Sequence, residues 1–213
     1  MFYVQEPDKF LRLGDVVRGY ISTNPTIKEP NLSSKSEGYD YKIEIGMPKY
    51  SVVLTPCCNI EKGKISLSPL IKIKSYFLLN PYFAEDLTRI NRRMTAQQSL
   101  KPEEWEKFDE EEKQRRLAEK INFALLEYFV YKENEIFDEY SIRDQMTRYY
   151  MVDMRNIYTI KCPMVRRPEE LRPKDAPIIE SKVLQLSVPT RSELRDKIAY
   201  YYSRPAEEDI LED

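Results

Sequence analysis

Two adjacent cysteines, Cys57 and Cys58, carry the most reactive side chains of this sequence. A thiolate is a nucleophile and a soft metal ligand, and Lys62 and Lys64 nearby favour the thiolate form of Cys58. Structural zinc sites usually take cysteines a few residues apart, because direct neighbours in an extended chain point to opposite sides. We therefore expect packed thiols and no metal site, with a redox or sensor thiol at either cysteine as the alternative.

The sequence has no histidine. Ser-His-Asp and Cys-His nucleophilic machinery, histidine-ligated zinc or iron, and a histidine pH switch are thereby excluded. Any catalysis has to use carboxylates, Lys, Arg, Tyr, Ser, Thr or Cys. We expect no cofactor, because the turn "NIEKGK" has Gly63 as its only glycine and does not make a loop that cradles phosphates.

Arginines and tyrosines form a second group of candidate contact residues. The chain contains 16 tyrosines, and nucleic-acid sites and protein interfaces both use aromatic and guanidinium groups. Nucleic acid is therefore a possible ligand beside a protein partner or a homo-oligomer. The candidate contact residues are Arg92, Arg93, Arg166, Arg167, Arg191, Arg195 and Tyr202.

Length and composition set the class of protein that must position these groups. A chain of 213 residues with 41% apolar and 33% charged residues buries a sizeable core, as one large domain or two small ones. No apolar run approaches the ~18 to 20 residues that cross a bilayer. The start, "MFYVQEPDKF", has no basic segment followed by an apolar one, which is the pattern of a secretory signal. We expect a cytoplasmic protein without membrane contact.

Strand patterns dominate the first part of the chain. "LGDVVRGYIS" predicts a strand over 15–22, and the Pro-, Ser- and Asn-rich stretch 23–40 predicts a long loop. "YKIEIG" alternates as a half-buried strand does, whereas the apolar run in "YSVVLTP" predicts a strand covered on both faces. The next strand, 65–73, contains Pro69, which removes a ladder donor and indicates an edge strand or a bulge.

The second part mixes helix and strand patterns. Pro81 begins a short helix, and Pro102 lies at the start of a second helical region. The strand patterns in "RYYMVDMR" and "NIYTIKC" meet around Arg155 and Asn156, which favours a tight hairpin between the two strands. "TRSE" matches a capping box and predicts a last helix capped at Thr190.

These elements predict an α+β fold in which a β-rich, barrel-like sheet carries a helical insertion and a C-terminal helix. Two small β-rich lobes joined by helices are the alternative. We expect one domain over 1–213. Its parts are barrel strands at 11–80, a helical insertion at 81–125, further strands at 126–188, a C-terminal helix at 189–204 and an acidic tail at 205–213.

Two motifs carry a family resemblance. "GDVV" at 14–17, a long loop and "SVVLTP" at 51–56 resemble the start of the MazF/PemK family, small SH3-like barrels that cleave RNA. That family has an Arg shortly before the second strand and a Ser or Thr on the next one. Here Lys49 lies near the first position, and Ser66 or Ser68 is the candidate for the second. The resemblance implies an SH3-like barrel and RNA as a substrate.

The same stretch also resembles uncharacterised bacterial proteins in which a Val-Val-Leu-Thr strand precedes Cys-Asp-Ile. This chain has Cys58, Asn59 and Ile60 at those positions, so an amide replaces the carboxylate. An amide is neither a base nor a charged metal ligand. This second resemblance implies no particular activity.

Two functions follow as expectations. The first is a non-catalytic binding or assembly protein of the bacterial or phage cytoplasm. The second is a metal-independent ribonuclease or other nucleic-acid-binding protein of the MazF/PemK type. Its site would use Ser66 or Ser68 as a polar orienter, Arg18 and Lys49 for phosphate and transition-state charge, and Glu61 as a base.

Overall fold

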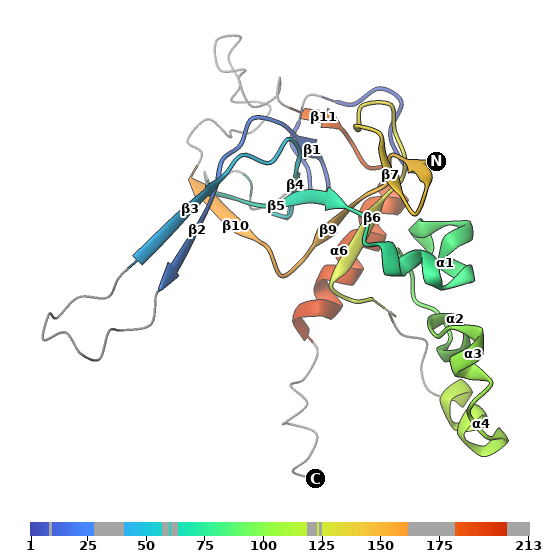
Figure 1. The fold of residues 1–213 in the computed structure, drawn as a ribbon. Coiled ribbons are helices and arrows are strands. Elements are labelled where there is room, and N and C mark those ends of the chain that lie inside the picture. Colours follow the sequence, from blue (N-terminus) through green and yellow to red (C-terminus); the bar gives the residue numbers. More distant parts are fainter. Residues whose placement is uncertain are drawn as a thin grey trace, which may run out of the picture. The chain divides into compact units, whose positions relative to one another are not determined.

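The computed structural model describes residues 1–8, 10–27, 41–56, 60, 64–118, 123, 125–161 and 182–203. Figure 1 shows the helices and strands of the chain, which divides into two compact units. The first unit takes in residues 1–7, 70–155 and 185–213, and the second takes in 8–69 and 156–184. The predicted α+β class is confirmed, since helices accompany mostly antiparallel strands.

The second unit is built from strands. Its main sheet has the order β11, β1, β4, β5, β10, and every pair in it is antiparallel. Strands β2 and β3 form a separate antiparallel pair, the ribbon. The strands are β1 (Val16–Val17), β2 (Ser22–Ile27), β3 (Tyr41–Gly46), β4 (Ser51–Val53), β5 (Lys64–Lys72), β10 (Tyr158–Lys161) and β11 (Lys182–Leu184).

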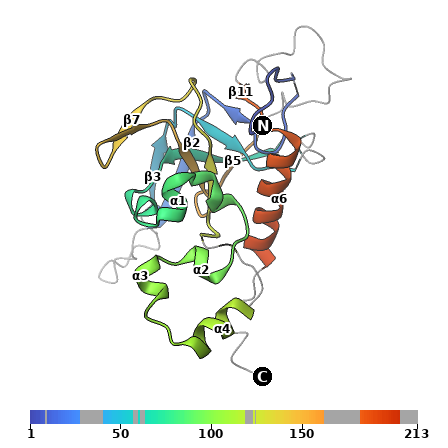
Figure 2. The ribbon, with the colours of Figure 1, turned by 90° about the vertical axis from the view of Figure 1, so that its right-hand side faces the viewer.

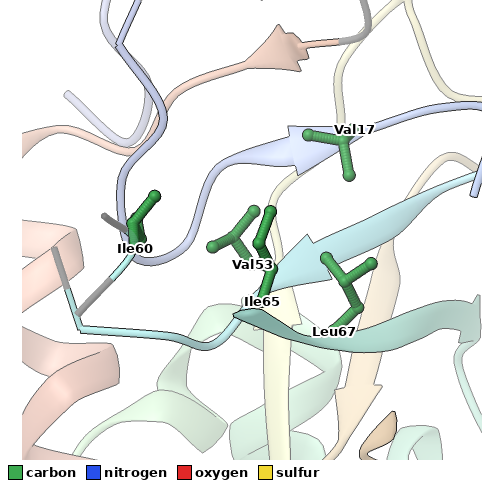
Figure 3. Close-up of a cluster of buried hydrophobic side chains, with 5 residues drawn as sticks. All are labelled: Val17, Val53, Ile60, Ile65 and Leu67. Carbon is green, nitrogen blue, oxygen red and sulfur yellow. The ribbon is translucent and has the colours of Figure 1, made fainter. Parts of the chain in front are cut away.

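One buried cluster of the second unit lies on one face of this sheet (Figure 3). β-Branched and leucine side chains alternate toward it along β5, because successive residues of a strand point to opposite faces. Leu11, Tyr20, Tyr158 and Ile160 pack around its margin. The buried cluster consists of Val17, Val53, Ile60, Ile65 and Leu67.

The first unit combines a smaller sheet with helices. The last residues of β5 pair with β9 (Tyr150–Asp153), and β9 pairs with β6 (Tyr128–Tyr131). The side-chain amide of Asn91 donates to the Val130 carbonyl at 2.7 Å and accepts from its N–H at 2.6 Å, so a side chain satisfies backbone groups of β6. A separate hairpin joins β7 (Tyr140–Ile142) to β8 (Gln145–Thr147).

Helices of the first unit are short except for the last. Figure 2 shows α1 to α4 as successive pieces and α6 as a single long rod. In the described part of the chain no helix is both long and apolar enough to cross a membrane. The helical elements are η2 (Ser75–Leu79), α1 (Pro81–Glu85), η3 (Leu87–Asn91), α2 (Ala96–Ser99), α3 (Pro102–Trp105), α4 (Glu110–Ala118) and α6 (Val188–Ser203).

Several sequence predictions fail on the strands. The described strands form no closed barrel. The strand expected at 15–22 is instead the short β1 followed by β2, which runs into the expected loop. β2 contains Pro25, which a two-stranded ribbon tolerates because each of its strands has an outer edge.

Pro69 lies inside a paired strand rather than on an edge strand. β5 pairs with β10 up to Leu67 and with β9 from Leu70 onward. Pro69, which has no N–H to donate, falls between these two stretches, while β4 pairs with it on the other side. The predicted hairpin between β9 and β10 is therefore wrong, since both strands pair with β5 and not with each other.

The last helix begins before the predicted cap. α6 starts at Val188, and the Ser187 hydroxyl accepts a 3.5 Å hydrogen bond from the Thr190 N–H. Ser187 thus takes the capping role that the sequence pattern assigns to Thr190, which is buried in the first turn. The buried face of α6 consists of Thr190, Leu194 and Lys197.

Candidate functional site

The ribbon exposes large apolar side chains. Ile43 and Ile45 lie two residues apart on β3 and therefore on the same face of the strand. Ile21 precedes β2, and Met47 follows β3. All four side chains have exposed fractions between 52% and 76%. Single exposed apolar residues are ordinary in folded proteins, but such a group at one element is typical of a contact surface.

Gly46 lies close to Ser22 across the ribbon. It is paired with Ser22, and a Cβ atom at Gly46 would lie only 2.6 Å from the Ser22 hydroxyl oxygen. The Ser22 hydroxyl in turn donates to the Gly46 carbonyl at 3.3 Å. A side chain at position 46 would therefore require the Ser22 hydroxyl to rotate away and give up this hydrogen bond.

Two predicted site residues meet at the ring of Tyr50. The Arg18 guanidinium carbon lies 5.0 Å from the ring centroid, and its NH2 group donates to the phenol oxygen at 3.4 Å. The ammonium nitrogen of Lys49 lies 5.5 Å from the same centroid. Arg18 and Lys49 are exposed while Tyr50 is buried. Both cations thus make cation–π contacts with this ring.

Ser66 and Ser68, the predicted polar orienters, are less exposed than Arg18 and Lys49. Ser68 has an exposed fraction of 0%. The Ser66 hydroxyl lies 3.1 Å from that of Thr159, and the Ser66 N–H donates to the Thr55 hydroxyl at 2.6 Å. Ser68 thus has no surface through which to touch a substrate. Three further candidates lie outside the described residues: Glu61, Cys57 and Cys58.

The arginines of the first unit are engaged within that unit. Arg92 forms a 3.2 Å ion pair with Glu193 of α6. Arg93 lies 5.5 Å from the ring centroids of both Phe123 and Tyr200. Both arginines thus make contacts inside the first unit, and these contacts stabilise its packing without a ligand.

The candidate contact residues on α6 also make contacts with neighbouring residues of the same unit. Arg191 donates to the Leu186 carbonyl at 3.1 Å, and Arg195 pairs with Asp196 at 3.3 Å. Tyr202 is exposed and packs edge-on against Tyr201. The remaining two arginines of the prediction, Arg166 and Arg167, lie outside the described residues.

A network around the Tyr128 hydroxyl was missed from the sequence. Its oxygen receives hydrogen bonds from Lys74 and, at 2.5 Å, from Arg155. Arg155 also binds both carboxylate oxygens of Asp153, at 2.8 and 2.7 Å. Burial opposes ionisation of Asp153, but hydrogen bonds from Arg155 and the nearby charge of Lys74 hold the pKa of Asp153 below its ordinary value. Opposite charges thus satisfy one another in this network.

A buried lysine was also missed. Lys197 has an exposed fraction of 0%, and its nitrogen donates to the Ile90 carbonyl at 2.5 Å. The ring centroid of Phe123 lies 5.2 Å from the same nitrogen. Burial lowers the pKa of Lys197 to about 7, although the charge of Glu127 works in the opposite direction. Lysine is rarely fully buried, so the sequence predicts a surface position for Lys197 and gives no signal of its burial.

Acidic and thiol side chains are the candidate metal ligands of this chain, which has no histidine. Across the described ranges, no group of three or more Cys, Asp or Glu side chains is placed to hold a metal ion.

Comparison of the chain with models of protein families, with curated proteins and with solved structures finds no match. The function of the chain therefore has to be inferred from its geometry alone.

Proposed function

We propose that this chain is a non-catalytic binding or assembly protein whose contact surface is the ribbon face that carries Ile43 and Ile45. The observation that carries the proposal is the exposure of these two side chains, with Ile21 and Met47 beside them. Burying each of them against a partner would contribute about 1.5 to 3 kcal/mol, which is a reason for a protein to keep them at its surface.

A second copy of the chain is the occupant that we propose. A two-fold interface brings the same patch of both copies together, so the patch has to be complementary to itself. An apolar row meets this condition, because apolar side chains pack on apolar side chains. The opposite face of β3 carries Glu44, so the charge at that position points away from the row.

The outer edge of β3 supports the same occupant. β3 pairs with β2 alone among the described strands, which leaves a row of backbone groups able to pair with another extended strand. Two β3 strands that pair there in antiparallel fashion place the Ile43 and Ile45 side chains of both copies next to one another on the same face of the joined sheet. The test is the concentration dependence of the oligomeric state, with lysine substitutions at Ile43 and Ile45.

A MazF/PemK-like ribonuclease is the second candidate function. The meeting of Arg18 and Lys49 at Tyr50 favours it, because two cations at one place suit a phosphate. This candidate function requires the strands of the second unit to have an SH3-like arrangement. The burial of Ser68 argues against it. Incubation of the protein with single-stranded RNA tests it, and cleavage that disappears in an Arg18→Gln/Lys49→Gln variant is the result it requires.

A further inference from the structure

Two lysines stand directly opposite each other on neighbouring strands of the second unit. The register of β5 and β10 pairs Lys64 with Lys161, and Ser66 with Thr159. Side chains of directly opposed residues lie on the same face with their Cβ atoms about 4.5 to 5.5 Å apart. The 3.1 Å approach of the Ser66 and Thr159 hydroxyls lies on the same face, two residues along each strand.

This face points away from the core. Ile65, which lies between Lys64 and Ser66, belongs to the buried cluster on the other side of the sheet (Figure 3). Ile160, which lies between Thr159 and Lys161, packs against that cluster. Lys64, Thr159 and Lys161 are exposed, and Ser66 is partly exposed. The outer face of the β5–β10 pair is therefore a polar strip that solvent reaches.

The two ammonium groups carry charges of the same sign on this strip. Among the described residues, no acidic side chain forms an ion pair with either lysine. Like charges directly across a strand pair destabilise a sheet. An anion between them removes this repulsion and gains two charge-assisted hydrogen bonds.

The hydroxyl groups complete the donor set. The Ser66 and Thr159 hydroxyls form one hydrogen bond with each other, in which either can be the donor, so the pair has one O–H left to offer to a neighbouring acceptor. A phosphate group has several strong acceptor oxygens and can take donors from both kinds of side chain at once. A carboxylate has only two oxygens and makes fuller use of a planar guanidinium than of separate ammonium groups.

We propose that the outer face of the β5–β10 pair binds a phosphate group, with Lys64 and Lys161 as its charged contacts and the hydrogen-bonded Ser66 and Thr159 hydroxyls as the source of one additional donor. The phosphate is supplied either by a nucleic-acid backbone or as free inorganic phosphate. This site lies on strands other than the ribbon, so it stands or falls independently of the assembly surface.

Two probes distinguish the sources of the phosphate. The first is a fluorescein-labelled oligouridylate of about 12 nucleotides, long enough to cover a strip of this kind, followed by anisotropy at two chloride concentrations. The second is inorganic phosphate, followed by calorimetric titration. The test variant is Lys64→Gln/Lys161→Gln. The control is Lys107→Gln/Lys132→Gln, which removes the same charge from exposed lysines of the first unit.

We expect the test variant to bind at least about tenfold more weakly than the wild type, since it cannot form the two charge-assisted hydrogen bonds. For the oligonucleotide, the slope of log affinity against log salt should fall by about 0.7 for each phosphate that the variant no longer neutralises. Weaker oligonucleotide binding assigns a nucleic-acid source, and weaker binding of inorganic phosphate alone assigns the free anion. The proposal is overturned if the wild type binds neither probe, or if the control variant is weakened as much as the test variant.

A Lys161→Glu variant separates ligand binding from a structural role. It places a carboxylate opposite Lys64, so we expect a higher melting temperature together with abolished phosphate binding. A lower melting temperature, or unchanged phosphate binding, would mean that the two lysines do not form a shared anion site.

Discussion

The nitrogen of Lys197 on α6 donates a 2.5 Å hydrogen bond to the carbonyl oxygen of Ile90 in η3, and no part of the lysine is exposed. Burial lowers the pKa of this lysine from 10.5 to about 7. In the unfolded chain the group returns to its ordinary value, so the unfolded state binds more protons between these two pH values. The folding stability of the first unit should therefore rise with pH in this window.

We predict that this rise approaches ~1.4 kcal/mol per pH unit and is absent in a Lys197→Met variant. Trp105, the single tryptophan, lies in the first unit, so its fluorescence during urea unfolding reports on that unit. The measurements run from pH 7 to about 9.5, below the ordinary pKa of tyrosine, so that tyrosine ionisation adds little to the pH dependence of stability. Lys132→Gln, at an exposed position, is the control. Equal slopes in the wild type and in the Lys197→Met variant would refute the assignment.

Tyr128→Phe should destabilise the first unit by about 1 to 3 kcal/mol. The phenol oxygen accepts hydrogen bonds from Lys74 and Arg155, and the substitution leaves both cations without this acceptor. Urea unfolding followed by Trp105 fluorescence measures the change. Tyr202→Phe removes an exposed hydroxyl and should change stability by less than about 0.5 kcal/mol. Equal effects of the two substitutions would show that the network adds nothing to stability.

Leu67→Ala should destabilise the second unit by about 2 to 5 kcal/mol, because it opens a cavity in the buried cluster. The second unit has no tryptophan, so hydrogen exchange of the β4 and β5 amides is the suitable measurement. Leu117→Ala makes the same chemical change at an exposed position outside the ribbon and should leave this exchange almost unchanged. Unaltered protection in the Leu67→Ala variant would contradict the placement of the core.

Local patterns predicted the elements whose stability is local. The alternation of "YKIEIG" predicted β3, and Pro81 marked the start of α1, where the Asn80 side chain accepts from the Tyr82 N–H. β2 was missed because Pro25 reads as a loop residue. The β7–β8 hairpin was missed as well, because its turn uses Arg143 and Asp144 at positive φ and not glycine or asparagine.

Pairings between distant segments were beyond these patterns. β9 and β10 are close in sequence, yet each pairs with a different part of β5. The candidate site shows the same limit: the resemblance pointed to Lys49, but only folding brings Arg18 and Lys49 to the ring of Tyr50. The opposed lysines of β5 and β10 also depend on a register that no local pattern contains.

Self-association through the ribbon is the central claim, and an Ile43→Lys/Ile45→Lys variant tests it most directly. Lysines at these positions add four positive charges to a two-fold interface and remove its apolar contacts, so the dimerisation affinity should fall more than about tenfold. Leu117→Lys/Met146→Lys makes the same chemical change at exposed apolar positions of the first unit and serves as the control.

The measurement is sedimentation velocity of the wild type and both variants over a wide range of protein concentration. The weight-average sedimentation coefficient of the wild type and of the control should rise with concentration, while the ribbon variant should sediment as a monomer throughout. A wild type that stays monomeric at every concentration, or a control that dissociates as readily as the ribbon variant, would contradict the proposed assembly surface.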